Sequence, residues 1–243
     1  FWYGENSHRP ESARRPEVHD SDGLLVAYEG GARTWRPLRN PSKIDTVDFP
    51  VRKLVRFGLL QRDRRAAHYA DGEALYERRP SAWIEPRGKG SAGKVRLVQL
   101  PTNDEYADNV VAYWIPEANP QPGGHLEAHY RIVWSLDEPD APVFAQVLAT
   151  REAKRPGGEG GAWFQLDFGG AGTPRRWGEV KVEVEIGPGG RLAGSRLTPY
   201  PENGGCQVVL EIEAMGREPV ELRCRLRDND DATSETWLYT WNP

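Results

Sequence analysis

Residues 95–115 read VRLVQLPTNDEYADNVVAYWI and place a polar insert between two apolar runs. The runs 95–100 and 110–115 are rich in β-branched and aromatic residues, which is typical of strands. The insert holds three carboxylates within five residues, Asp104, Glu105 and Asp108. A rigid scaffold often holds reactive side chains at a strand end, but a solvated loop has the same pattern because carboxylates are costly to bury. Spacing alone leaves both interpretations open.

A second acidic cluster lies upstream, where Glu17, His19, Asp20 and Asp22 follow one another closely. Cleavage of a glycosidic bond requires a pair of carboxyl groups that flank the bond. Neither cluster suffices alone, so such chemistry requires the fold to bring the two clusters together.

Composition narrows the class of protein. The chain has 243 residues, with 36 acidic and 32 basic side chains and a formal net charge of −4. This balance leaves no excess positive field for a polyanion, so nucleic acid is not an expected partner. No apolar run approaches the ~18 residues that cross a bilayer, so no membrane span is expected. The 26 glycines and 20 prolines favour many short strands joined by turns.

The first half predicts strands with one charged interruption. We expect a hairpin of residues 24–28 and 32–35 around the turn 29–31, a loop at 39–50, and strands at 57–61 and 125–134. Residues 62–71 are too charged for a core strand and predict a helical turn or an ordered loop. The Pro-containing stretch 137–142 then breaks the pattern.

Seven strand candidates follow that break, at 143–150, 162–168, 179–186, 191–197, 206–214, 218–227 and 234–240. Seven short strands in about 100 residues favour an immunoglobulin-like sandwich. The sequence therefore predicts an all-β chain with one domain at 1–136, a linker at 137–142 and a second domain at 143–243. Alternation places Cys206 and Cys224 on inward faces, and we expect them to face each other on neighbouring antiparallel strands, bonded or free.

The sequence lacks the residue spacings that several common kinds of functional site require. No Cys-x-x-Cys or His-Glu-x-x-His pattern occurs, and His125 and His129 would lie about 13 Å apart on one strand, so neither a metal site nor a cofactor is expected. The serines lack a nucleophile elbow, and the glycine-rich residues 88–93 lack the Walker spacing. Carboxylate chemistry remains, in a groove lined by arginines and by Tyr69, Tyr76, Trp83 and Tyr106. Each of these aromatic residues could instead pack in the core.

Six runs of sequence are similar to one known family. They are FWYGEN from Phe1, RPEVHDSDGL from Arg15, LLQRDR from Leu59, YERRPS from Tyr76, PTNDE from Pro101 and SETW from Ser234. These runs resemble the periplasmic glucan biosynthesis proteins of the OpgG/OpgD (MdoG) family. Members are about twice this length, and the chain begins at Phe1 without Met, so we expect the C-terminal half of a longer polypeptide.

The resemblance implies a fold, a reaction and a location. The fold is the latter part of a large galactose-mutarotase-like β-sandwich, followed by an immunoglobulin-like β-sandwich. The reaction is an inverting hydrolysis of β-1,2-glucan, or a cyclising transglycosylation, in the periplasm. The family motifs place the general acid at Asp108 and the general base at Asp20. They also imply that Tyr76, Glu105, Arg62 and His19 bind substrate. This chain departs from the family pattern at Ala66, Ala67, Tyr106 and Ala107, where the family has more polar residues. That departure puts substrate length and product type in doubt.

Two other functions remain open. A glucan-binding or scaffold protein of the same pathway would share the aromatic groove but show no turnover. The two readings differ in whether Asp20 and Asp108 converge on one cleft. A sugar mutarotase is suggested by the fold alone and lacks a convincing His–Glu pair. The sequence does not decide whether the protein is a homodimer.

Overall fold

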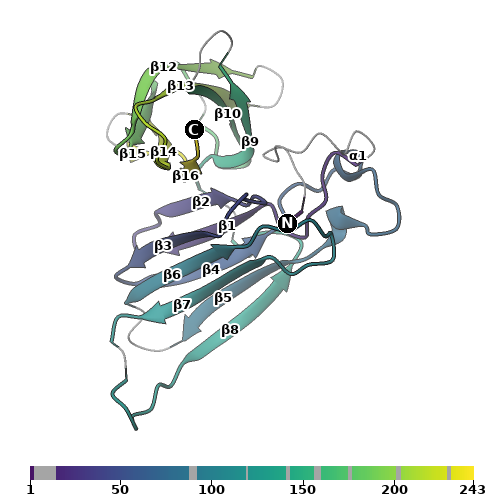
Figure 1. The fold of residues 1–243 in the computed structure, drawn as a ribbon, viewed down its shortest axis with the longest axis vertical. Helices are drawn as coiled ribbons and strands as arrows, with labels where there is room; N and C mark the ends of the chain where they lie inside the picture. Colours follow the sequence, from purple (N-terminus) through teal and green to yellow (C-terminus); the bar gives the residue numbers. More distant parts are fainter. Residues whose placement is uncertain are drawn as a thin grey trace. The chain divides into compact units, whose positions relative to one another are not determined.

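The computed structural model describes residues 1–2, 15–87, 92–118, 120–140, 143–155, 160–174, 177–200, 204–228 and 231–243. The chain forms two compact units, Phe1–Arg33 with Leu38–Glu138, and Thr34–Pro37 with Pro139–Pro243. The regular structure of the described residues is almost entirely strand (Figure 1), which confirms the predicted all-β class. None of the helices in this described part has the length and apolarity needed to cross a membrane.

The first unit contains two antiparallel groups of strands. The strands β1 (Gly23–Tyr28), β4 (Leu54–Leu60), β5 (Ser81–Arg87) and β8 (His129–Ser135) pair in the order β1-β4-β5-β8. The second group has the order β3-β6-β7 and comprises β3 (Asp45–Val51), β6 (Gly93–Gln99) and β7 (Val110–Pro116). Residues of both groups, among them Phe57 and Trp114, line one cavity of about 480 Å³, as expected for the two layers of a sandwich.

The predicted strand–insert–strand unit is present as the β6–β7 hairpin. Val95, Leu97 and Gln99 alternate with more exposed neighbours and are fully buried, so one face of β6 belongs to the core. Gln99 is the register partner of Val110. The Leu100 N–H donates to the Asn109 carbonyl at 2.8 Å, and the insert therefore closes as the loop of a hairpin.

Two local predictions in the first unit were wrong. Residues 45–50, expected within a loop, belong to the edge strand β3, where Pro50 is tolerated because an edge strand leaves some N–H positions unpaired. Its Asp48 faces outward and pairs with Lys94 and Arg96, so charge did not prevent strand formation. The last predicted strand starts late: β8 begins at His129, and His125 precedes it.

The charged stretch 62–71 forms an ordered turn, as predicted. It contains the helix α1 (Ala66–Tyr69), and the 3₁₀ helix η1 (Tyr76–Arg78) follows. Tyr69 is fully buried in a small cluster with Val18 and Tyr76. These contacts join residues 62–78, the helical segment, to residues 15–22, the acidic segment, and fix the position of both.

The second unit contains all seven strands predicted for it. They are β9 (Gln146–Lys154), β10 (Gly161–Gly169), β11 (Val180–Ile186), β12 (Gly190–Pro199), β13 (Cys206–Ala214), β14 (Val220–Asp228) and β16 (Thr236–Trp241). One sheet has the order β12-β13-β10-β9. Four strands of another sheet follow the order β11-β14-β16-β2, with the short β15 (Asp231–Ala232) on β14. The strand β2 (Arg33–Pro37) pairs in parallel with β16, a pairing that the sequence did not predict.

Both cysteines point inward, as predicted, and neither side chain is exposed. The expectation that they lie on neighbouring strands was wrong, although the two thiols are close enough that Cys206 adds to the burial that raises the pKa of Cys224. Cys206 lies on β13, which pairs with β10 and β12, whereas Cys224 lies on β14 in the other sheet. The chain changes sheets between them instead of forming a flat hairpin. Both thiols are free, and burial raises the pKa of Cys206 to about 12, so this thiol is unreactive near neutral pH.

The SETW run has a structural role in the second unit. The Ser234 hydroxyl accepts the Leu226 N–H at 2.8 Å, and the buried Glu235 carboxylate accepts the Val147 N–H at 3.2 Å. Trp237 packs on Phe164 and donates its indole N–H to Thr150. This motif of the family therefore stabilises the core of the unit.

We predict that Gly58→Ala destabilises the first unit. A Cβ at Gly58 would overlap the backbone oxygen of Ala82 on the paired strand β5, and neither backbone can move without breaking the ladder. Overpacking of this kind costs about 1–3 kcal/mol. Gly72→Ala is the control, because a Cβ there meets no atom within 4 Å. Denaturant unfolding should show a lower midpoint for Gly58→Ala alone; equal midpoints for the two variants would contradict this close packing.

Candidate functional site

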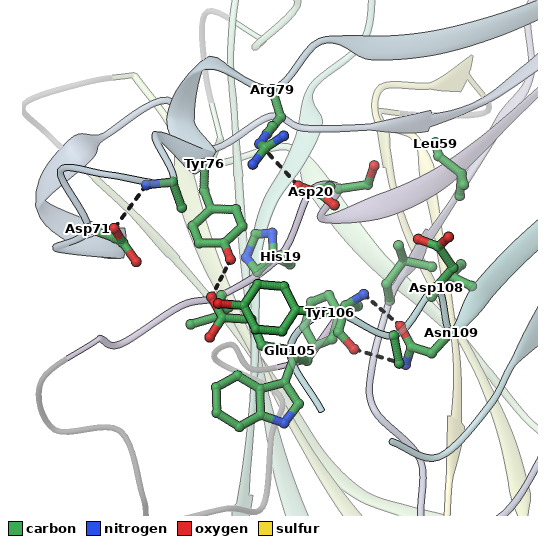
Figure 2. Close-up of a pocket in the computed structure, with 18 of the residues that line it drawn as sticks. His19, Asp20, Leu59, Asp71, Tyr76, Arg79, Glu105, Tyr106, Asp108 and Asn109 are labelled. Atoms are coloured by element: carbon green, nitrogen blue, oxygen red, sulfur yellow. Dashed lines mark hydrogen bonds and ion pairs between the residues drawn. The ribbon is translucent and has the colours of Figure 1, made fainter. Parts of the chain in front are cut away.

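The first unit contains a cavity of about 880 Å³. Most of its lining comes from three segments, 15–21, 71–82 and 105–110, and the rest comes from Phe1, Trp2, Leu38, Leu59 and Trp134. Figure 2 shows ten of the lining side chains labelled. Polar and aromatic groups from distant parts of the sequence therefore share one concave, partly open site, the usual form of a ligand site.

Asp20 and Asp108, the predicted pair of carboxylates, both line this cavity (Figure 2). Asp20 lies just before β1, and Asp108 lies two residues before β7 at the end of the insert. The Asp20 side chain is 71% exposed, and its Oδ1 lies 3.2 Å from Arg79 Nε. Asp108 is also exposed. Both carboxyl groups are therefore accessible to a ligand in the cavity.

Glu105 is held in the wall by three side-chain hydrogen bonds. Its two oxygens accept from both terminal nitrogens of Arg15, at 2.8 and 2.7 Å, and the Tyr76 hydroxyl donates to Oε1 at 2.7 Å. Arg15 also pairs with Asp71 at 3.0 Å. The hydrogen bond from Arg15 lowers the pKa of Glu105, with a smaller contribution from Tyr76. Glu105 is therefore an anion whose position is fixed by charge-assisted bonds.

His19 lies at the floor of the cavity with 5% of its surface exposed. Its Nε2 is 3.2 Å from Glu17, and its Nδ1 is 3.1 Å from Gln61 and 3.4 Å from Asp22. Burial alone would lower the pKa of His19, but the hydrogen bond with Glu17 and the charges of Asp22 and Glu17 outweigh it, so the pKa is raised. The imidazole thus holds a buried polar network together directly beside Asp20.

The same network fixes the turn that follows β4. The side-chain amide of Gln61 donates to the Tyr69 hydroxyl at 2.8 Å and to the Tyr76 carbonyl at 3.0 Å. The Asp22 carboxylate accepts the backbone N–H groups of Arg62 and Asp63. The acidic segment and the helical segment are therefore bonded to each other beneath the cavity.

The structure does not place Arg62 in the cavity wall, contrary to expectation. Its guanidinium is buried and donates to Glu138 at 2.8 Å, and Arg33 donates to the same carboxylate at 2.8 Å. Arg62 follows β4 directly, and its side chain leaves the strand end toward this anion. Its backbone N–H still donates to the Asp22 carboxylate and so belongs to the hydrogen-bonded network beneath the cavity.

The predicted aromatic lining divides into two groups. Tyr69 and Trp83 are fully buried, so core packing was the correct interpretation for both. Tyr76 and Tyr106 line the cavity. Sequence reasoning missed Arg15, Arg79 and Trp134; the two arginines stand inside the quoted motif runs, which was the available signal.

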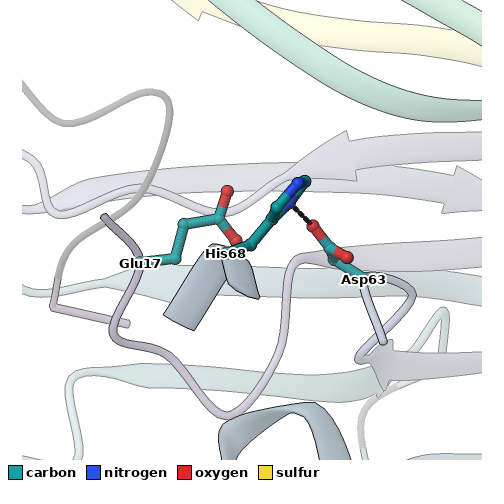
Figure 3. Close-up of side chains that lie close together, drawn as sticks. All are labelled: Glu17, Asp63 and His68. Carbon is teal, nitrogen blue, oxygen red and sulfur yellow. Dashed lines mark hydrogen bonds and ion pairs between the residues drawn. The ribbon is translucent and has the colours of Figure 1, made fainter. Parts of the chain in front are cut away.

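Glu17, Asp63 and His68 form a further cluster (Figure 3), whose nearest ligand-type atoms all lie within 4.8 Å of one another. Asp63 and His68 belong to the ordered turn 62–71, whereas Glu17 lies far upstream, so no spacing pattern could reveal the cluster. Asp63 already accepts from His68 Nδ1 and from the backbone and side chain of Arg65. These donors occupy the lone pairs that a metal ion would need, so the contacts are those of a hydrogen-bonded turn.

Comparison with known proteins places the whole chain in one family. Residues 1–241 match the family described as "Periplasmic glucan biosynthesis protein, MdoG". The chain belongs to the MdoG family. Its relatives include "Glucans biosynthesis protein D 2" of Ralstonia nicotianae, 37% identical over 257 residues, and "Glucans biosynthesis protein D" of Stenotrophomonas maltophilia, 38% identical over 254 residues.

A third MdoG-family relative, "Glucans biosynthesis protein D" of Xanthomonas oryzae pv. oryzae, is 38% identical over 258 residues. In all three comparisons the match covers 100% of this chain and 47% of the relative. The chain therefore spans about half the length of these relatives and corresponds to their C-terminal half.

We predict that Arg15→Gln raises the pKa of Glu105, because the largest contribution to its lowered value is removed. A carboxyl with a lowered folded-state pKa stabilises the protein above its unfolded pKa, and this stabilisation is lost as pH falls through the folded value. The variant should thus be less stable than the parent at neutral pH, with a smaller difference in acid.

The measurement for Arg15→Gln is an NMR titration of the glutamate carboxyls. Arg225→Gln is the matched control, since Arg225 makes the largest contribution to holding the pKa of Glu183 at about 2 in the second unit. Arg225→Gln should raise the pKa of Glu183 and leave the pKa of Glu105 unchanged. An unchanged Glu105 titration in Arg15→Gln would show that the pair does not control this carboxylate.

Proposed function

We propose that the protein acts on β-1,2-glucan in the periplasm, as an inverting glycoside hydrolase or transglycosylase of osmoregulated periplasmic glucan biosynthesis. The observation that carries the proposal is the presence of Asp20 and Asp108 in one cavity. Their two acidic clusters are far apart in sequence, and inversion at a glycosidic carbon needs two carboxyl groups around one bond. Membership of a family described by periplasmic glucan biosynthesis supplies the substrate class and the location.

Asp108 is the general acid in this proposal. Its carboxyl proton passes to the glycosidic oxygen as the bond from the anomeric carbon to that oxygen breaks, which yields a neutral hydroxyl as the leaving group. Asp20 is the general base and removes a proton from the attacking water, or from a sugar hydroxyl in a transglycosylation. The contact with Arg79 Nε at 3.2 Å orients the Asp20 carboxylate.

The wall formed by Arg15, Glu105 and Tyr76 binds sugar hydroxyls in this proposal. A carboxylate accepts hydroxyl hydrogens and a guanidinium donates to hydroxyl oxygens, and both groups are already ordered by each other. Prior ordering reduces the entropy lost when a ligand binds. His19 acts from the cavity floor by fixing the adjacent Asp20.

A glucan-binding protein without turnover is the alternative from another class. It is favoured by the family description, which names biosynthesis and no cleavage reaction, and by the 47% coverage of the relatives. Such a protein would bind glucan through the same wall. It would have no rate to lose when either carboxylate is replaced.

We predict that Asp108→Asn in the full natural chain slows turnover of β-1,2-glucan by about 10²–10⁴, the usual contribution of general acid–base catalysis. The amide is nearly isosteric, so the fold and glucan binding should survive. Asp20→Asn should likewise spare binding and stop activation of the acceptor. Product formation by chromatography and glucan affinity by calorimetry separate these effects.

Asp231→Asn is the control, because Asp231 is exposed in the second unit and outside the cavity. It should retain the parent rate. Parent-like turnover in Asp108→Asn would refute the assignment of the acid. Glucan binding by a parent that forms no product would instead favour the scaffold function.

We also predict that Tyr76→Phe and Glu105→Gln weaken glucan binding or turnover without unfolding the chain. Tyr76→Phe removes the donor of the 2.7 Å bond to Glu105, and Glu105→Gln removes the negative charge and one of the two oxygens that bind Arg15, so the remaining wall holds the ligand less well. Steady-state kinetics and thermal unfolding are the measurements. Unchanged kinetics in both variants would exclude this wall as the binding surface.

A further inference from the structure

We propose that Tyr106 is a stacking platform for a glucosyl residue at the mouth of the cavity and that it determines which glucan lengths bind well. This inference rests on the proposed function and adds a binding position to it. Tyr106 is 89% exposed, the highest value among the exposed large hydrophobic side chains in the described ranges. It nevertheless lines the cavity, between Glu105 and Asp108 of the same insert.

The backbone that carries Tyr106 is ordered by hydrogen bonds. The Tyr106 N–H donates to Asp104 Oδ1 at 2.9 Å, and the Asp104 N–H donates to Thr102 Oγ1 at 2.9 Å. The side chain of Asn40 bonds both the N–H and the carbonyl of Thr102, at 2.9 and 2.7 Å. The ring is therefore presented by a fixed loop, although the ring itself is exposed.

Glu105 and Asn109, on either side of Tyr106 in the insert, restrict the loop further. Glu105 is held by Arg15 and Tyr76, and Asn109 donates to the Leu100 carbonyl at 3.0 Å across the base of the insert. Figure 2 shows the Tyr106 ring projecting among the labelled lining residues. Within the part of the chain described by the structure, no hydrogen bond or ring contact engages the Tyr106 side chain. Core packing therefore does not explain the ring.

The chemistry around the Tyr106 ring fits a pyranose better than it fits an apolar ligand. A pyranose ring has C–H groups on its faces, which pack on an aromatic face, and hydroxyl groups around its rim. Glu105 and Asp108 flank Tyr106 and offer acceptors for such hydroxyls. An aromatic side chain loses little conformational entropy on binding because only two torsions are fixed. A purely apolar ligand would cover the exposed Asp108 carboxylate without donating a hydrogen bond to it.

The test uses the protein in its full natural length and a β-1,2-glucan series of increasing chain length. Tyr106→Ala should raise KM for long glucans roughly three- to tenfold, with kcat nearly unchanged, because a stacking contact is lost and the carboxylates remain. Tyr106→Phe and Tyr106→Trp should keep the parent KM, since both preserve an aromatic face. The shortest glucans, which do not reach the ring, should show no difference between the variants.

Trp163→Ala is the control, because Trp163 is an exposed aromatic residue on β10 of the second unit. It should keep the parent KM, and thermal unfolding should confirm that all variants are folded. An unchanged KM in Tyr106→Ala would overturn the platform while parent turnover still supported the proposed function. A loss in Tyr106→Phe equal to that in Tyr106→Ala would show a hydroxyl hydrogen bond in place of stacking. A parent that neither binds nor converts the glucan would refute the proposed function and this inference together.

Discussion

Glu105 is the point at which three segments of the first unit meet. Its carboxylate binds Arg15 of the upstream segment and Tyr76 of the helical segment, and it belongs itself to the β6–β7 insert. Charge-assisted bonds of 2.7–2.8 Å in a partly buried position restrict all three segments at once. The cavity depends on this contact, because the carboxylates Asp20 and Asp108 are each only a few residues from one of the joined segments.

A second layer of bonds beneath the cavity supports the first. His19 is bonded to Glu17 and Gln61, and Gln61 reaches Tyr69 and the Tyr76 carbonyl. A buried network of this kind is costly when any partner is missing, and it is rigid when all partners are present. The positions of Asp20 and Tyr76 therefore follow from buried contacts, while the Asp20 carboxylate stays exposed.

Local pattern predicted much of the fold, and long-range pairing explains what it missed. Alternation of apolar residues found the β6–β7 hairpin and all seven strands of the second unit. It missed β3, since Pro50 and Asp48 look like loop residues until the edge position is known. It could not show that β2 pairs with β16, or that Cys206 and Cys224 belong to different sheets, because neither fact is encoded in nearby residues.

The sequence predicted those site residues that lie in the runs resembling the family. Asp20, Asp108, Glu105 and Tyr76 share the cavity, but Arg62 does not, because side-chain direction at a strand end depends on the distant Glu138. Arg15 and Arg79 were missed for a related reason. Their partners Glu105 and Asp20 become neighbours only after the turns are folded.

The configuration of the anomeric carbon after reaction is the most direct test of an inverting pair. NMR of the first product formed from β-1,2-glucan should show the α configuration at that carbon, whether the acceptor is water or a sugar hydroxyl, because the proposed base Asp20 would activate an attack opposite the leaving oxygen. A β configuration at the same carbon would contradict the assigned roles of Asp20 and Asp108, and the absence of any product would contradict catalysis itself.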